Sequence, residues 1–110
     1  MDTQYSVALV FSGNNLSHDS LMFYMMEPPT TFINTRSTIE KYACTGSECT
    51  SLIQAFVNTL FPIMNRIKEC GVEKIVFEVR LSAPSIATLP DTLLGRMFLI
   101  GASLTFHPES

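Results

Sequence analysis

The stretch that decides the fold is residues 74–81, KIVFEVRL. Every second side chain in it, beginning with Ile75, is apolar, and Glu78 and Arg80 occupy positions in between. Alternation with a period of two is typical of a β-strand with one face in the core and the other face toward solvent. The sequence therefore predicts a sheet that is covered mainly on one side.

The longest predicted helix, residues 48–70, precedes this strand. One apolar stripe at helical spacing consists of Leu52, Phe56, Leu60, Met64 and Ile67. Further apolar residues widen this stripe, namely Ile53, Val57, Phe61 and Ile63. Pro62 predicts a kink because it removes one backbone hydrogen bond. Gly71 is placed to end the helix in a left-handed cap. Because the apolar face is wider than one sheet contact needs, we expect a second subunit to cover part of it.

The remaining segments predict further strands and helices. Residues 5–11 predict a strand, and residues 17–26 predict a helix that Ser17 caps and Pro28 stops. A short strand or ordered loop is expected over 30–39 and a strand over 40–45. A helix after Pro90 and a strand over 102–106 end the series.

This order predicts a single α+β domain over residues 1–110. We expect a mainly antiparallel sheet with helices packed on one face. A concrete version is a ferredoxin-like split βαβ core with a C-terminal helix–strand addition. The length also fits one domain, since domains commonly hold about 100–150 residues.

Composition excludes several function classes. The 110 residues carry a net charge of −3 and no basic cluster, so we expect no nucleic-acid partner. We expect no membrane span, because apolar runs fall well short of the roughly 20 residues it needs. The start lacks a signal-peptide pattern and the cysteines number 3, which predicts reduced thiols in the cytoplasm. No zinc-like spacing of cysteine and histidine occurs, and no metal or cofactor is predicted.

Six motifs follow one another in an order that is moderately specific. They are the capped first helix, its proline–threonine extension, the end of the long helix, the clearest strand, the proline-initiated helix and the last strand: Asn15–Asp19, Glu27–Thr30, Lys68–Val72, Ile75–Val79, Leu89–Leu94 and Ile100–Phe106. In this order the chain resembles an uncharacterised bacterial family, domain of unknown function 4279. The resemblance implies an α+β fold and supplies no activity and no site residues.

No residue is predicted to be catalytic. Ser17, His18 and Asp19 are triad residue types, but neighbours on a helix do not converge, and helix capping explains them better. Cys49 falls in the first turn of the long helix, where the helix dipole could lower the pKa of its thiol. No base is identifiable for it, so no enzyme activity is predicted.

Two groups of residues are candidate binding sites. For a ligand or partner we select the polar loop and two strand positions, namely Asn34, Arg36, Tyr42, Glu78 and Arg80. For an oligomer interface we select apolar residues of the first and long helices, namely Met22, Met25, Ile53, Val57 and Phe61.

From these features we expect a non-enzymatic protein-interaction module that self-associates, with itself in a homodimer or another protein as partner. By analogy at the level of fold, an accessory or immunity-like role fits such a module. The alternative is a small-molecule binding domain or weak enzyme. Its site would lie between the sheet and the loops over 30–39 and 82–89.

Overall fold

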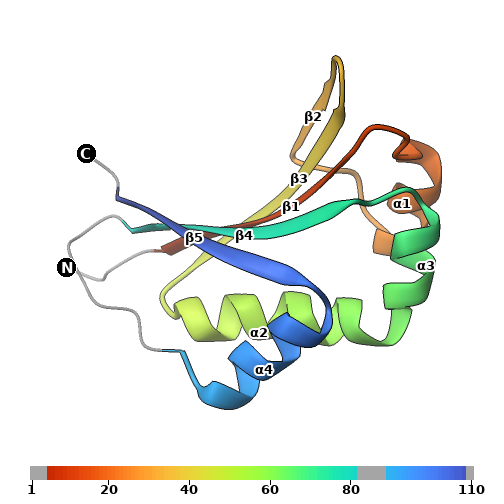
Figure 1. Ribbon diagram of the computed structural model, residues 1–110. Helices are drawn as coiled ribbons and strands as arrows, with labels where there is room; N and C mark the ends of the chain where they lie inside the picture. Colours follow the sequence, from red (N-terminus) through yellow and green to blue (C-terminus); the bar gives the residue numbers. More distant parts are fainter. Residues whose placement is uncertain (1–4, 82–88, 109–110) are drawn as a thin grey trace.

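The computed structural model describes residues 5–81 and 89–108, which form strands and helices (Figure 1). In chain order the elements are β1 (Tyr5–Gly13), α1 (His18–Met25), β2 (Thr31–Asn34), β3 (Thr38–Gly46), α2 (Cys49–Leu60), the 3-10 turn η1 (Phe61–Ile63), α3 (Met64–Glu69), β4 (Lys74–Leu81), α4 (Asp91–Leu99) and β5 (Ala102–Pro108).

The strands form a five-stranded sheet with the order β2-β3-β1-β4-β5. β1 lies at its centre and pairs antiparallel with both β3 and β4, so that Leu9 stands between Tyr42 and Phe77. β2 pairs antiparallel with β3, and β5 pairs parallel with β4. The predicted α+β class and mainly antiparallel sheet are confirmed, whereas the ferredoxin-like comparison stays a prediction.

The core lies between one face of this sheet and the helices, which all lie on that side (Figure 1). On β1 the alternate residues Val7, Leu9 and Phe11 have no exposed surface. They meet a row on α2 whose members Ile53 and Val57 are equally buried. Each such side chain stabilises the fold by about 1.5–3 kcal/mol relative to an exposed position.

The long predicted helix is divided and faces the core differently than expected. Pro62 lies in η1, which separates α2 from α3. Ile53 and Val57, selected above for an oligomer interface, are 0% exposed and pack in the protomer's own core. Met97 of α4 belongs to the same buried cluster, and α4 contacts α2. Much of the wide apolar face is therefore covered within one chain, which corrects the expectation that a second subunit is needed there.

Two glycines offer a matched test of these backbone assignments. Gly71 follows α3 with φ +91°, and a Cβ there would collide with the carbonyl oxygen of Asn15. Gly95 lies inside α4 with open space around it. We expect Gly71→Ala to lower the free energy of unfolding by more than about 1 kcal/mol. Gly95→Ala is expected to raise it by about 0.5–1 kcal/mol. Urea unfolding measures both, and equal shifts of the same sign would contradict the assignment.

Candidate functional site

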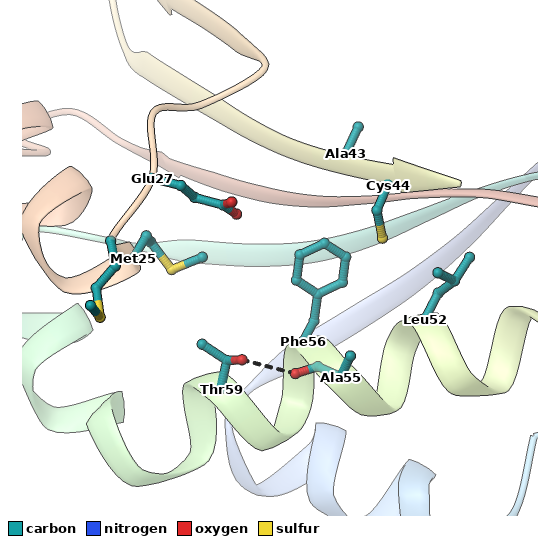
Figure 2. Close-up of a pocket in the computed structure, with 9 residues that line it drawn as sticks. Met25, Glu27, Ala43, Cys44, Leu52, Ala55, Phe56 and Thr59 are labelled. Atoms are coloured by element: carbon teal, nitrogen blue, oxygen red, sulfur yellow. Dashed lines mark hydrogen bonds between the residues drawn. The ribbon is translucent and has the colours of Figure 1, made fainter. Parts of the chain in front are cut away.

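A groove of about 440 Å³ opens between β3 and α2 and is closed at one end by the turn after α1 (Figure 2). We call it the β3–α2 groove. It is lined mainly by apolar residues from these three segments: Met25, Met26, Glu27, Ala43, Cys44, Leu52, Ala55, Phe56 and Thr59. Volumes of this size lie within the range of ligand-binding pockets.

α2 forms the floor of the groove. The half-buried ring of Phe56 stands up from the helix toward β3, as Figure 2 shows. Leu52 lies one turn earlier, and Ala55 between them is exposed. The Thr59 hydroxyl donates to the Ala55 carbonyl oxygen at 3.0 Å, so this polar group is already satisfied by its own helix. The floor therefore offers apolar contact and little hydrogen bonding.

The turn after α1 places one carboxylate at the end of the groove. α1 ends at Met25, and the next residue, Met26, is a non-glycine residue with φ 64° whose amide donates to the Met22 carbonyl oxygen at 2.9 Å. This left-handed residue ends the helix before the proline that was expected to stop it. Glu27 follows directly, and Figure 2 shows its carboxylate directed into the groove. Of the residues in the described ranges that line the groove, it is the one that carries a charge.

The electrostatic effect of Glu27 reaches the residues of β3. Burial raises the pKa of the Cys44 thiol, and the Glu27 charge raises it further. Burial raises the pKa of Tyr42 as well, with Glu40 as the next cause and Glu27 as a smaller one. A site that disfavours anions in this way favours a cation.

The backbone of β3 forms the upper wall. β2 pairs only with Thr38–Lys41 of β3. Thr30, just before β2, extends this pairing. Its amide donates to the Lys41 carbonyl oxygen at 2.7 Å, and its hydroxyl accepts from the Ala43 amide at 3.1 Å. Within the described ranges, no strand lies beside residues 44–46 on that side. The groove thus runs below an uncovered strand edge.

Neither Cys44 nor Cys49 has the features of a nucleophile. Figure 2 shows the Cys44 sulfur directed into the groove, but burial raises its pKa. Cys49 begins α2, where the helix dipole favours a lowered thiol pKa. Its side chain is buried, and burial raises its pKa instead. A raised pKa leaves less thiolate at neutral pH, so the helix-dipole argument for Cys49 is wrong.

A buried polar cluster lies farther along β3. The Glu40 carboxylate has no exposed surface, and its Oε1 accepts a hydrogen bond from the Tyr42 hydroxyl at 3.3 Å. His18 Nδ1 lies 3.1 Å from the same oxygen, at ion-pair distance but without hydrogen-bond alignment. The His18 ring stacks on Phe32 with centroids 4.3 Å apart. The cluster joins α1 to the β2–β3 hairpin and does not line the groove.

The five predicted ligand or partner residues fall in three separate places. Asn34 and Arg36 lie at the β2–β3 hairpin, where the Asn34 side chain accepts from the Thr38 hydroxyl at 3.2 Å. Tyr42 is 2% exposed in the core, so a ligand does not reach it. Glu78 and Arg80 lie on the sheet face that no helix of the described residues covers, as the alternation of β4 predicted. The structure does not bring these residues together into one site.

The open sheet face carries a shallow hollow of about 330 Å³ that includes Glu78 and Arg80. Glu78 is paired with Lys41, whose Nζ lies 3.3 Å from its carboxylate oxygen. The alternative small-molecule site was expected between the sheet and the loops over 30–39 and 82–89, and this hollow is the feature nearest to it. Residues 82–88 of the second loop lie outside the described residues.

The residues predicted for an oligomer interface also lie in different environments. Met25 is buried and contributes to the end of the groove, whereas Met22 is half-buried and Phe61 is 48% exposed. Glu27 and Phe56, which define the groove, were not selected. The sequence does show Glu27 as a charged residue directly before the proline that ends the first predicted helix. Its position near β3, however, depends on the left-handed turn at Met26.

Comparisons add no relative from which a role could be transferred. Family models, curated proteins and solved structures all gave no match to this chain. The resemblance to domain of unknown function 4279 therefore stays a prediction. Over residues 5–81 and 89–108 there is no cluster of three metal-ligating side chains and no helix long and apolar enough to cross a membrane.

The burial of Tyr42, together with its contact with Glu40, predicts a loss of stability at alkaline pH. Since the folded state raises the pKa of Tyr42 above its ordinary value of 10.0, it holds the phenolic proton more tightly than the unfolded state. This contribution is complete below about pH 10 and is lost as the pH rises through the folded-state pKa. Between pH 10 and 11 we expect the wild type to lose about 1 kcal/mol more stability than Tyr42→Phe.

Urea unfolding at several pH values measures this difference. The three buried or half-buried cysteines are present in both proteins, so their titration does not contribute to it. Parallel stability curves for the two proteins would show that Tyr42 ionises equally in both states.

Proposed function

We propose that this chain is a non-catalytic protein-interaction module that holds part of a partner protein in the β3–α2 groove. The observation that carries the proposal is an apolar groove of about 440 Å³ in which, among the described residues, Glu27 alone contributes a charge. An apolar group that bears a positive charge complements this lining. An accessory or immunity-like role, in which the module blocks its partner, belongs to the same proposal.

The chemistry around the groove supports binding rather than catalysis. The Cys44 thiol has a raised pKa, and the Thr59 hydroxyl donates to its own helix. Neither group is paired with a base that would activate it. The three free cysteines fit a reducing compartment, and we propose the cytoplasm.

Small amines test the proposal directly. We expect phenethylamine to bind the groove more tightly than phenethyl alcohol, and phenylpropionate to bind least, because Glu27 favours a cation and disfavours an anion. In Glu27→Gln the amine should lose its advantage of about two- to fivefold over the alcohol, as an exposed ion pair predicts. NMR titration measures affinity, and slower alkylation of Cys44 by iodoacetamide reports occupancy of the groove.

Ala55→Trp serves as the second variant, because it places a large ring in the groove from an exposed helix position. It should weaken the amine and the alcohol alike. Equal affinity of wild type and Ala55→Trp, or chemical-shift changes confined to residues outside the groove, would overturn the proposal.

Self-association is a second proposal, favoured by apolar side chains on the outer side of α4. Phe98 is 82% exposed, Leu99 is 68% exposed and Leu94 is 41% exposed, while Leu93 and Met97 of the same helix are buried. Contiguous exposed apolar surface is typical of an interaction site. We propose a second copy of the chain as its occupant, which replaces the buried residues Ile53 and Val57 in that role.

Sedimentation velocity tests this second proposal. We expect a concentration-dependent dimer in the wild type and a monomer in Phe98→Glu. Phe23→Glu on α1 is the matched control, since Phe23 is 75% exposed on a different helix, and it should leave the dimer intact. A wild type that is monomeric throughout would contradict the proposal.

A further inference from the structure

We infer that the partner of the β3–α2 groove is an extended polypeptide segment that adds a strand to the edge of β3. This inference rests on the proposed function and specifies its partner. The segment carries an apolar side chain and a basic side chain at alternate positions. Its backbone pairs with residues 43–46, and its side chains enter the groove.

The first step of the argument is the direction of the β3 backbone groups. The Lys41 carbonyl oxygen and the Ala43 amide both point toward Thr30, away from β1. In a strand, the amide and carbonyl of every second residue point to the same side. By this alternation the backbone groups of Thr45 share the outward side with those of Ala43, whereas the backbone groups of Cys44 face β1. The Ala43 carbonyl and both backbone groups of Thr45 are thus directed outward.

This edge lacks the features that usually prevent strand addition. Natural edge strands are blunted by charged side chains, proline or a covering segment. The sequence at 43–46 is Ala-Cys-Thr-Gly, with no charge and no proline. Ala43 and Thr45 are exposed, and within the described part of the chain β2 covers only Thr38–Lys41. An extended chain of another molecule can pair here through main-chain hydrogen bonds.

The side-chain preference follows from the two ends of the groove. Leu52 lies against Gly46, at the end of β3, so this end is apolar. Glu27 acts on Tyr42 and Cys44, so the acidic end lies nearer the middle of β3. Figure 2 shows Glu27 and Leu52 at opposite ends of the groove, with Phe56 between them. An added strand would turn alternate side chains toward this floor. An apolar group fits beside Leu52 and a lysine or arginine fits beside Glu27.

The peptide experiment uses acetylated and amidated hexapeptides. One leucine and one lysine occupy alternate positions among threonines, in both orders, because the two orders correspond to antiparallel and parallel addition. We expect one order to bind, with the largest NMR shift changes at the Thr45 amide and protection of Cys44 from alkylation. Replacing the lysine with glutamate should weaken binding about two- to fivefold or more.

N-methylation of single peptide amides tests the backbone pairing on the wild-type protein. Methyl groups at alternate amides should weaken binding about tenfold, because each removes a hydrogen bond to β3, and those at the intervening amides should have little effect. The inference would be overturned if methylation weakened peptide binding equally at every amide, or at no amide.

Thr45→Pro and Thr45→Ala are the matched protein variants. Proline removes the outward amide and is tolerated on edge strands, whereas alanine keeps the amide. We expect Thr45→Pro to lose peptide binding and Thr45→Ala to retain it, while both still bind phenethylamine. Peptide binding equal in the two variants would contradict strand addition.

The two proposals can fail separately. Amine binding without the alternating N-methyl pattern would leave the groove as a binding site and overturn the extended segment. Equal affinity of the wild type for phenethylamine and phenethyl alcohol would overturn the proposed function itself. Concentration-dependent changes at Thr45 in the peptide-free protein would identify a second copy as the strand and would also overturn the inference.

Discussion

β3 and β2 differ in length, and this difference determines which part of the sheet is accessible. β3 has nine residues and pairs with β1 along all of them, whereas β2 has four. Thr30, which follows α1 and precedes β2, extends the pairing along β3 by one further position. Within residues 5–81 and 89–108 no further strand covers the rest of the β3 edge above α2, and Thr45 there is exposed. The groove, its acidic end and the proposed strand addition all depend on this mismatch.

The core explains why the edge can be uncovered without loss of the fold. β1 holds the sheet together from its centre, and its buried row Val7, Leu9 and Phe11 packs on α2. Since apolar burial is the main favourable term in folding, β3 is anchored through β1 and the helices rather than through β2. Its outer edge is then free to take part in binding.

The sequence predicted the elements whose signals are local. Alternation at 74–81 gave β4, Ser17 caps α1 as expected, and Gly71 has the left-handed conformation expected after α3. The predicted face of the long helix was less accurate. The apolar face of α2 is wide, and periodicity alone did not show that Ile53 and Val57 would face the sheet while α4 covered a neighbouring side.

The groove could not be predicted in the same way, because it depends on contacts between distant segments. Glu27 and Leu52 are far apart in the sequence and line the same groove only because α1 ends in a left-handed turn at Met26 and α2 crosses below β3. The buried Glu40 illustrates the same difficulty. Its position on the inward side of β3 follows from alternation, but its contacts with His18 and Tyr42 require the folded chain.

Amide hydrogen exchange at Cys44 and Thr45 in the isolated protein tests the uncovered edge most directly. These neighbours lie in the same strand, but the Cys44 amide points toward β1 and the Thr45 amide points away from it. The structure predicts that Cys44 is protected to nearly the stability of the sheet, while Thr45 exchanges orders of magnitude faster, at about the rate of an exposed amide. Comparable protection of both amides in a monomeric sample would mean that the β3 edge is already covered, and would contradict this account.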